Sequence, residues 1–600
     1  MAGDYLNLVV AKVTINGEEQ KFVYLKLHQK FNGHHLFTII VNYLSPGNTF
    51  QQTPEKFINY VGEKASIVFS HKKTGESNEF DGIITSVEMI GSEGEHGGIA
   101  IHGMSPTILL DNNRTLNSWT DKNLEAIIKD AAKDYGNVPL VCKLKFTEDI
   151  PYMSQYNESV FDFMNRMSKQ YGEWFYYDGA NVFFGNPDKN DTEKLVYDID
   201  LEEVRLIANL IPGKLKKYDY VAKENKPYSA SAPDSVEGMD DFLTQAQKRS
   251  DQCYTPATLL SANPHIKNKT ELETQLKVAK TMATSQMINI KGIAKTCRVK
   301  IGTVADVSFP ASMKLPPLGK YRITEVVHEV RRDGHYSNSF LGIAAGMEYI
   351  PVPEIPMPLA MPELATVTSN KDDKKLGRVK VRFDWQEDGK TTNWIRVQTP
   401  DAGVSDKVPG NRGFVYIPEE NDQVMVSYEH GNPDRPFVSG SMFHSGSGKG
   451  GDADNKIKSI MTRSGIGIVM DDSTGSVIIV DQTGENLIVI DGKDSMTITT
   501  TKTITLTNEK ATIILDEDQM LLDAKDICIN GSKSVTIKSG KNQIVVTDPD
   551  GVFGTGKAVV LEAEDTMDLT TKTGNISGDS LNINGSQDVN IAGGLVKINS

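Results

Sequence analysis

The sequence has few cysteines, no long apolar run and no excess of positive charge. Its four cysteines, Cys142, Cys253, Cys297 and Cys528, lie far apart and form no CxxC pair. This spacing argues against a zinc ribbon and is typical of a chain that folds in a reducing compartment. No apolar run approaches the roughly 20 residues that a membrane-spanning helix needs. We therefore expect neither a disulfide-rich secreted domain nor a helical membrane protein.

Basic residues are outnumbered, with 64 Lys and Arg against 79 Asp and Glu, and the formal net charge is −15. Such a balance repels a polyanion, so nucleic acid is not an expected partner. The N-terminal stretch MAGDYLNLVV lacks a basic region and carries an acid, so it does not predict a signal peptide. We expect a protein that is made in the cytoplasm and that would leave the cell through a dedicated machine.

Two composition breaks divide the 600 residues. PVPEIPMPLAMP (Pro351–Pro362) has five prolines in twelve residues and predicts an extended connector. SGSGKGGDADN (Ser445–Asn455) has the composition of a flexible tether. The predicted organisation is an α+β region at 1–362, a barrel at 370–444, a tether at 445–455 and a repetitive β region at 456–600.

The first region mixes strand and helix patterns. Asn16-Gly17 lies between alternating apolar residues and predicts a hairpin turn. Apolar residues at helical spacing predict helices over 121–136 and 157–172, with Thr120 and Asn157 as N-caps and Gly136 and Gly172 as stops. Two more helices are expected near 236–249 and 270–288.

The second region predicts a small closed barrel. GRVKVRFDW, WIRVQT, GFVYIP, DQVMVSYE and FVSGSMF are five short strand patterns within about 70 residues, separated by glycine-rich turns. This density of strands is typical of an OB fold.

The third region consists of short alternating segments, among them SVIIVD, NLIVID, KTITLT and DICIN. INGSKSVTI (Ile529–Ile537) nearly repeats as INGSQDVNI (Ile583–Ile591), and strands at a fixed period indicate a β-solenoid. Each segment buries one narrow apolar row in a single chain and leaves open edges that favour aggregation. We therefore predict an intertwined homo-oligomeric needle. The residues predicted to face the core of the needle are Ile529, Val535, Ile537, Ile583, Val589 and Ile591.

Several stretches resemble catalytic or metal-binding motifs without completing them. GVFGTGKA (Gly551–Ala558) ends in Ala558 where a P-loop needs Ser or Thr, and it precedes a strand pattern, so we interpret it as an irregular turn. His328-Glu329 lacks the second histidine of HExxH and lies in a hairpin pattern around Asp333-Gly334. DPDG and GGDADN lack the further ligands of calcium loops. The sequence therefore predicts no catalytic residue, no cofactor and no metal.

The stretch YEHGNPDRPFVSGSMFH (Tyr428–His444) combines two histidines, two acids and an arginine with turn-forming residues. We interpret it as scaffold: Asn432-Pro433 forms a turn, and the charges of Asp434 and Arg435 hold that turn. Phe437, Val438 and Met442 are expected in the barrel core.

The region Gly377–His444 resembles the OB-domain signature of VgrG, the spike family of type VI secretion systems, which is related to the hub and needle of contractile phage tails. QYNESVFDFMNRMSKQYGEWFYYD and LLDNNRTLNSWTDKNLEAIIKDAAKDYG are similar to two N-terminal segments of the family. The motif residues that carry the resemblance are Gly377, Arg378, Val379, Trp394, Gly413, Pro418, Asp422, Gly431, Asn432, Pro433, Asp434, Arg435, Pro436 and Gly440.

The resemblance implies a mainly β homotrimer with an α+β hub, an OB collar and a C-terminal triple-stranded β-helix. The hub would dock on the Hcp tube and the baseplate, and a PAAR-repeat protein would bind the tip at Leu595, Val596 and Ile598. Such a spike is secreted, carries effectors or their adaptors, contacts the target membrane transiently and is not an enzyme. The sequence ends at LVKINS without a toxin domain, which indicates a carrier.

Two alternatives stay open. A phage or phage-like tail spike has the same fold. A β-solenoid hydrolase is disfavoured because 456–600 contains a single aromatic residue, Phe553, for stacking on sugars. The sequence also leaves open whether 548–557 loops out of the needle.

Overall fold

The computed structural model describes residues 8–42, 58–90, 98–136, 138–187, 191–263, 266–448, 453–547, 551–561, 565–568 and 570–597. The chain forms two compact units, 1–450 and 451–600, each of which is described by itself.

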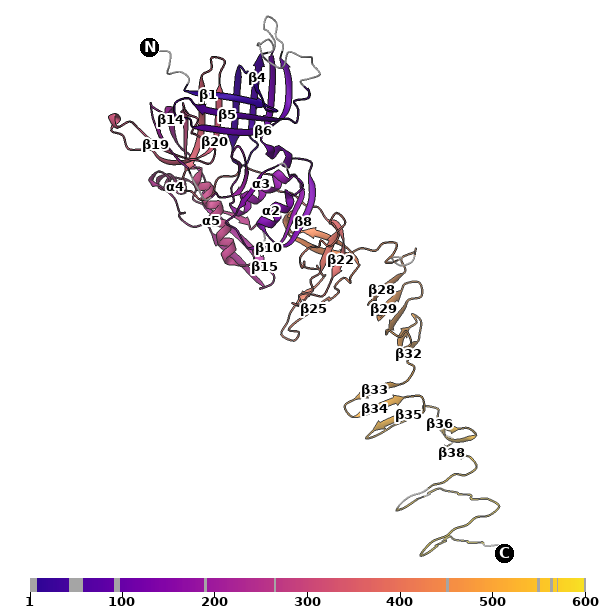
Figure 1. The fold of residues 1–600 in the computed structure, drawn as a ribbon. Coiled ribbons are helices and arrows are strands. Elements are labelled where there is room, and N and C mark those ends of the chain that lie inside the picture. The colour runs from indigo at the N-terminus through magenta and orange to yellow at the C-terminus, as the bar shows by residue number, and fades with distance from the viewer. Residues whose placement is uncertain are drawn as a thin grey trace, which may run out of the picture. The chain divides into compact units, whose positions relative to one another are not determined.

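A large, mostly antiparallel sheet organises the first unit, in the order β14-β18-β21-β20-β3-β4-β7-β6-β5-β1-β2, with β19 paired to β20 and β13 to β19 (Figure 1). Its strands are β1 (Val9–Ile15), β2 (Glu18–Gln20), β3 (Tyr24–Lys30), β4 (Leu36–Asn42), β5 (Lys64–His71), β6 (Ser77–Ile90), β7 (Gly98–Met104), β13 (Thr192–Val196), β14 (Leu201–Ala208), β18 (Ile288–Ala294), β19 (Val304–Ser308), β20 (Gly319–Val330) and β21 (Tyr336–Ala344). Alternate side chains of these strands form the apolar core.

Two predicted hairpins are confirmed in this sheet. β1 and β2 pair around Asn16 (φ 52°) and Gly17 (φ 81°), the positive φ values that a tight hairpin turn requires. His328 lies on β20, which turns into β21 through residues 331–335. Because this histidine is on a strand and not a helix, the HExxH interpretation stays excluded.

Four α-helices lie in the described part of this unit: α2 (Leu124–Ala131), α3 (Val160–Tyr171), α4 (Asp241–Cys253) and α5 (Lys269–Ser285). The predicted N-caps were wrong, because Asn123 caps α2 and Ser159 caps α3. Gly172 does end α3 with φ 76°, whereas α2 ends at Ala131 with Ala132 as its C-cap, before the predicted Gly136. Short 3₁₀ turns add η1 (Pro106–Leu110), η2 (Ala311–Met313) and η3 (Glu429–Gly431).

Smaller sheets surround the helices: β8 (Thr115–Asn123) pairs with β10 (Asp149–Glu158), and β12 (Val182–Gly185) lies between β9 (Leu140–Lys143) and β11 (Phe175–Tyr177). β15 (Leu215–Val221) lies between β16 (Lys226–Ser231) and β17 (Thr258–Ser261), and α5 packs against it. Apolar residues of α2 and α3 join the core of the large sheet. The helices therefore connect that sheet to β8 and β10.

The barrel follows residues 351–362, which have no regular secondary structure, as predicted for a connector. Its sheet has the order β23-β22-β26-β27, with β22 (Glu363–Ser369), β23 (Lys380–Phe383), β26 (Gln423–Tyr428) and β27 (Pro436–Ser441). Single bridges of Ile395 to Val379 and of Val397 to Val438 close it. β24 (Ala402–Gly403) and β25 (Arg412–Gly413) form a separate small hairpin.

Parts of the barrel prediction were wrong. WIRVQT forms only the two single bridges of Ile395 and Val397, and GFVYIP contains only Gly413, the last residue of β25. Neither segment pairs along its length with another described strand of the same chain. Val438 lies in the core, but Phe437 is half-buried and Met442 is exposed.

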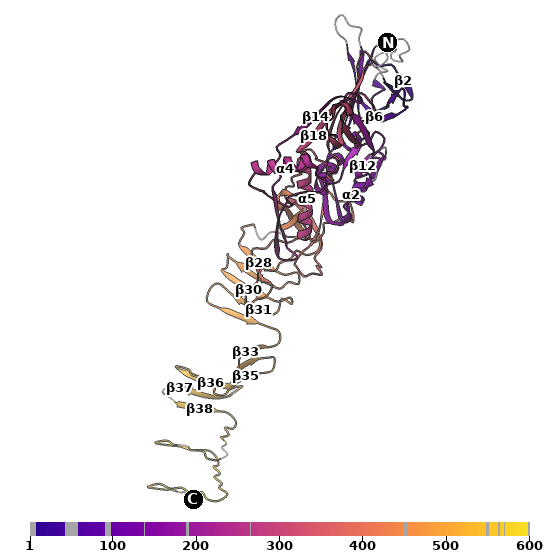
Figure 2. The ribbon, with the colours of Figure 1, turned by 90° about the vertical axis from the view of Figure 1, so that its left-hand side faces the viewer.

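The second unit consists of small antiparallel sheets, whose strands lie side by side in Figure 2. Their strands are β28 (Ile457–Met461), β29 (Gly467–Asp471), β30 (Ser476–Val480), β31 (Leu487–Ile490) and β32 (Met496–Thr499); β33 (Ile504–Asn508), β34 (Ala511–Leu515) and β35 (Met520–Ala524); and β36 (Ser534–Ser539), β37 (Asn542–Thr547) and β38 (Gly551–Thr555). The P-loop-like stretch thus begins in β38 and is not wholly a turn. The described residues after Thr555 contain no strand, unlike the strands predicted at 583–591.

Candidate functional site: a buried ionic junction

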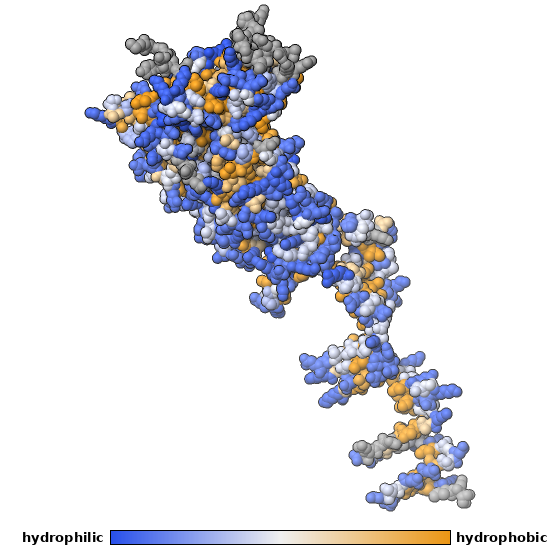
Figure 3. All heavy atoms as spheres, in the orientation of Figure 1, coloured by the Kyte–Doolittle hydropathy of each residue, from blue (hydrophilic) through white to orange (hydrophobic). Residues whose placement is uncertain are grey.

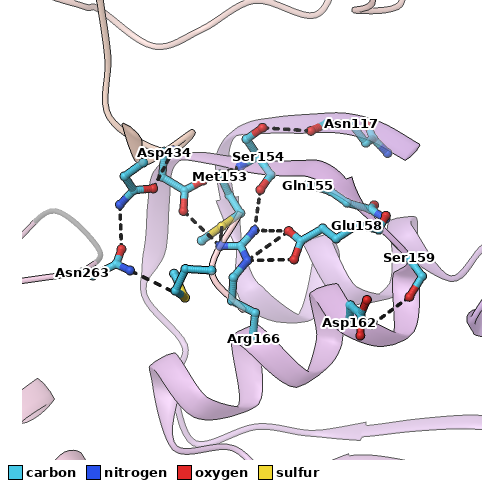
Figure 4. A network of polar contacts seen from close by, with 12 residues as sticks. Asn117, Met153, Ser154, Gln155, Glu158, Ser159, Asp162, Arg166, Asn263 and Asp434 are labelled. Carbon is cyan, nitrogen blue, oxygen red and sulfur yellow. Dashed lines mark hydrogen bonds and ion pairs between the residues drawn. The ribbon is translucent and has the colours of Figure 1, made fainter. Parts of the chain in front are cut away.

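A buried arginine on α3 joins two carboxylates from different parts of the chain (Figure 4). Arg166 follows Phe163 and Met164 on the buried side of the helix, and its side chain is 1% exposed. Its guanidinium donates to both oxygens of Glu158, with distances of 2.6, 3.0 and 3.2 Å, and to Oδ2 of Asp434 at 3.2 Å. A further bond of 2.6 Å reaches the carbonyl of Ser154. This one side chain therefore ties α3, β10 and the barrel together.

The turn before β27 positions Asp434. His430 (φ 55°) and Gly431 (φ 67°) bend the backbone, and the amide of Asp434 donates to the side chain of Asn432 at 3.0 Å. Asp434 Oδ1 then accepts the backbone N–H of Ser154 on β10 at 2.7 Å. The asparagine-proline turn chemistry of the sequence thus places a carboxylate against another domain.

Burial and charge set the protonation of this cluster. Burial disfavours a charged guanidinium, but Asp434 and Glu158 outweigh it and raise the pKa of Arg166. Burial also raises the pKa of both Glu158 and Asp434, because the loss of water around each carboxylate outweighs the lowering of its pKa by Arg166. The arginine is therefore the fixed charge around which both acids are arranged.

Arg435 makes a second buried ion pair, with Asp219 on β15. The arginine side chain is 3% exposed and the aspartate side chain 6%. Asp219 is held in turn by the backbone amides of Tyr220 at 2.9 Å and Ile266 at 3.2 Å. Adjacent residues of one turn therefore reach two separate elements of the N-terminal region.

Further polar contacts extend the same interface. They are Gln386 to Ser118 (2.6 Å), Lys390 to Asn117 (2.8 Å), Asn393 to Asp121 (3.0 Å), Thr120 to the carbonyl of Thr391 (2.6 Å) and Asn432 to Asn263 (2.6 Å). Hydrogen bonds between surfaces of this kind fix orientation more than they add stability. The interface is suited to holding the barrel at one angle.

The prediction that Asp434 and Arg435 hold their own turn describes only part of their role. Arg435 lies 3.9 Å from Glu429 of that turn, but the main partners of both residues lie more than 200 residues away. Sequence reasoning missed Arg166, Glu158 and Asp219. One signal was available for Arg166: it stands among Phe163, Met164 and Met167 of an amphipathic helix, where a charge needs a buried partner.

The other motif residues shape the barrel. Val379 is buried, Pro433 is buried, Pro436 begins β27, and Gly440 lies within β27. Gly377 (φ 66°) and Gly413 (φ 107°) take backbone angles that favour glycine. Arg378 pairs with Asp372 at 2.6 Å and lies over the ring of Trp394. The Pro418 carbonyl accepts from Asn370, and Asp422 accepts the amide of Glu419 at 2.8 Å.

A polar cavity of about 380 Å³ lies beside the junction, between β8, α2 and residues 385–390. Asp130 and Glu387 are among the acids that line it. Asp130 is partly buried, which by itself would raise its pKa, but hydrogen bonds from Trp119 and Lys133 give a lowered pKa. Lys390 lowers the pKa of Glu387. Both carboxylates are therefore held ionised, and neither is tuned to donate a proton at neutral pH.

Within the described ranges, no group of three or more His, Cys, Asp and Glu side chains is arranged to hold a metal ion. No helix among these residues is long and apolar enough to cross a membrane.

The predicted needle residues are uncovered in the single chain, and Figure 3 shows hydrophobic residues at the surface throughout the second unit. The exposed fractions are 61% for Ile529, 61% for Ile537, 57% for Ile583, 47% for Val589 and 67% for Ile591, while Val535 is half-buried. Leu595 and Val596 of the predicted tip are exposed as well, and Ile598 lies outside the described residues. Of the stretch 548–557, residues 551–555 pair with β37 as β38.

Two family models match the chain. Residues 35–196 match the phage tail baseplate hub family, and residues 363–443 match the type VI secretion system/phage-baseplate injector OB domain. The second match contains Asp434 and Arg435, and the first contains Arg166 and Glu158. The Arg166–Asp434 pair therefore joins the two matched regions.

Curated relatives match over a limited length. The type VI secretion system spike protein VgrG1b of Pseudomonas aeruginosa is 31% identical over 137 residues, which are 21% of this chain and 18% of that protein. The actin cross-linking toxin VgrG1 of Vibrio cholerae is 28% identical over 117 residues, 18% of this chain and 10% of that protein. The match thus spans less than a fifth of the length of these relatives.

Among solved structures, a chain of the Francisella PdpA–VgrG complex aligns with a TM-score of 0.53 at 11% identity, over 82% of this chain and 80% of that chain. This likeness concerns the fold. Together with the sequence matches, it confirms the predicted resemblance to VgrG spikes and the predicted mainly β chain with a hub-like region and an OB domain.

Proposed function

We propose that this chain is a structural spike of a contractile type VI secretion system and that it works as a homotrimer. One observation carries the proposal beyond the family matches: described residues of the second unit hold apolar side chains in solvent, as at Ile529 and Ile537, which are each 61% exposed. Single apolar side chains at a surface are ordinary, but a repeated row of them marks a surface that binds a partner. Such a row fits a chain whose core is completed by further copies.

The row recurs along the second unit. Its strands pair within small sheets, and apolar side chains such as Ile498 (42%), Ile544 (50%) and Ile576 (74%) stay exposed. Three copies around one axis would bring these rows together in a dry core, with Thr, Asp and Lys outside. Burial of each Val, Ile or Leu contributes about 1.5–3 kcal/mol. The domains proposed are a hub at 1–362, an OB barrel at 370–444, a tether at 445–455 and a triple β-helix at 456–600.

The proposed work is mechanical. A contracting sheath drives the tube, the tube drives the hub, and the needle pierces the target membrane. The ionic junction around Arg166 suits this task, because buried charge pairs are costly to separate and tolerate few orientations. We propose that it keeps the barrel aligned with the hub under load.

The partners proposed are the Hcp tube and the baseplate at the hub, a PAAR-repeat protein at the tip, and effectors or their adaptors as cargo. We propose a non-enzymatic carrier that is made in the cytoplasm and secreted with the apparatus. The Vibrio cholerae relative is named as a toxin, but the alignment spans 10% of it. The phage-like tail hub remains the second candidate, because one family model describes a phage tail hub.

The mass of the purified chain in solution, measured by light scattering on a sizing column, tests this proposal. Three copies of a 66.1 kDa chain weigh about 198 kDa. A trimer whose resistance to SDS maps to residues 456–600 is expected. A stable monomer would overturn the spike and reopen the solenoid hydrolase.

A further inference from the structure

An arm of the barrel, residues 402–417, leaves its apolar side chains exposed. Its two strands, β24 and β25, pair only through Ala402–Gly413 and Gly403–Arg412. The exposed apolar side chains are Val404 (67%), Val408 (42%), Phe414 (52%), Val415 (57%) and Tyr416 (56%). Figure 1 shows the β25 hairpin standing away from the sheet that contains β22. A hairpin this short is not stable by itself, so the arm needs a surface to rest on.

The end of the arm, Phe414–Ile417, has the composition of a strand but lacks a partner. The amide of Phe414 donates to the backbone carbonyl of Asp401 at 2.9 Å. Val415, Tyr416 and Ile417 make no backbone–backbone hydrogen bond within the described part of the chain. The Phe414 and Tyr416 rings lie 6.4 Å apart on one side, and Ile417 packs on the barrel core. An extended segment that is held at both ends and presents two half-exposed aromatic rings has the features of a docking element.

The connector before the barrel offers a matching row. Met357, Leu359 and Met361 are 45%, 68% and 64% exposed and alternate with Ala360, which is 5% exposed. Ala360 donates its amide to the carbonyl of Gly431 at 2.8 Å, so this residue is fixed against the barrel. Leu359 and Met361 on either side of it stay mostly in solvent, with one methyl of Leu359 against Gly431. Methionine adapts to varied partners and makes favourable contacts with aromatic rings. We name Met357, Leu359 and Met361 the methionine row.

The arm and the methionine row are different surfaces, and contacts between two different surfaces build a head-to-tail assembly. A closed ring built from head-to-tail contacts needs two complementary patches on every copy. The barrel carries an aromatic patch on the arm and an apolar row on the connector. In a ring of three copies the arm therefore meets a different surface of the next copy, and thioethers make favourable contacts with aromatic rings.

Chain length keeps neighbouring barrels within reach. The last barrel strand ends at Ser441, and the first strand of the second unit begins at Ile457. The residues between them span at most roughly 50 Å when fully extended. If three second units share an axis, three barrels are held near that axis.

We propose that the arm of one copy docks on the methionine row of the next copy, so that Phe414 and Tyr416 cover Met357, Leu359 and Met361. This inference rests on the proposed homotrimer and adds the surfaces that close its collar. Each copy gives one arm and receives one, and the contact buries apolar area that the single chain leaves in water.

Photocrosslinking of the full chain tests the contact. A benzophenone amino acid replaces Tyr416, and a matched control carries it at Asp406, a polar position of the same arm. Irradiation at position 416 is expected to give products of dimer and trimer mass on a heated denaturing gel, which an unirradiated sample does not give, with the adduct on the peptide that contains residues 357–361. The control is expected to give little of this adduct. Leu359→Asp is expected to reduce the yield roughly tenfold, because the carboxylate would be desolvated.

The outcomes separate this inference from the proposed function. Adducts of monomer mass only, or adducts of dimer mass on another segment such as 453–547, overturn the docking contact while a measured trimer mass preserves the spike. A monomer mass by light scattering overturns both. Equal adduct yields from positions 406 and 416 also overturn the docking contact, since the aromatic side of the arm would then have no preference for the methionine row.

Discussion

The guanidinium of Arg166 on α3 donates to the carboxylate of Asp434 in the barrel at 3.2 Å, with both side chains almost fully buried. The two residues belong to regions that match different families, a tail hub and an injector OB domain. A buried charge without its partner is far costlier than the pair is stabilising. The pair therefore makes the fold of each region depend on correct placement of the other.

Asp434→Ala should destabilise the first unit by about 3–5 kcal/mol, because it leaves Arg166 with one carboxylate fewer and the Ser154 amide without its acceptor. Thermal unfolding followed by calorimetry measures this loss. Asp388→Ala is the matched control, since Asp388 pairs with Arg382 at the surface and its side chain is fully exposed. Equal melting temperatures for the two variants would contradict a structural role for the junction.

Asp219 and Arg435 should be coupled. Arg435→Ala leaves the buried carboxylate of Asp219 without its arginine, and Asp219→Ala leaves the buried guanidinium of Arg435 without its carboxylate. The double variant removes both charges and leaves neither group without this partner. We expect the double variant to be more stable than the sum of the single effects predicts, by about 1–3 kcal/mol. Denaturant unfolding of all four proteins gives this coupling. Additive effects would mean that the two side chains act independently.

The limits of sequence reasoning are visible at this junction. Turn chemistry identified Asn432-Pro433, and alternation identified β26 and β27, because these signals are local. The partner of Asp434 lies 268 positions away along the chain, and no local pattern specifies such a distance. The caps of α2 and α3 were misplaced by two or three residues, since several polar residues precede each helix and only the backbone angles decide among them.

The second unit shows a different limit. The sequence shows the regular spacing of its apolar residues, as at Ile529 and Ile537. A single chain, however, pairs its strands locally and leaves both side chains 61% exposed. The sequence of an intertwined assembly encodes contacts between copies, and those contacts are absent from one copy. The hub-like region and the barrel, whose cores are formed within one chain, were easier to assign.

Two buried histidines should make the fold sensitive to acid. Burial lowers the pKa of His328 and of His35 to about 3, from an ordinary value of 6.5. His328 is held neutral between Asn78 at 3.3 Å and Tyr336 at 2.8 Å and stacks on Phe69. Between pH 6.5 and about 3 the unfolded chain binds protons that the folded chain excludes. The free energy of unfolding therefore falls as the pH falls through this window, by about 1.4 kcal/mol per unit for each histidine.

His328→Gln removes one of these titrations and keeps a side chain that can donate and accept. Relative to the unchanged protein, its loss of stability between pH 7 and pH 5 should be smaller by about 2 kcal/mol, although its stability at pH 7 is lower. Comparing the two proteins cancels contributions from other groups, including the carboxylates beside Arg166. Denaturant unfolding at both pH values measures the difference. Identical pH dependence would show that His328 is not protonated on unfolding.

Ile537→Asp tests the needle against the single chain. In one copy Ile537 is 61% exposed on β36, so a carboxylate there should cost little. In a three-chain core the same substitution buries three carboxylates and removes three apolar contacts, each worth about 1.5–3 kcal/mol. Lys538→Asp, on the opposite side of the same strand, changes more charge without entering the core. We expect the Ile537 variant alone to lose the trimer mass and the SDS resistance, measured by light scattering and unheated gels. If both variants remain trimeric, the apolar row faces solvent, and the copies are held together elsewhere.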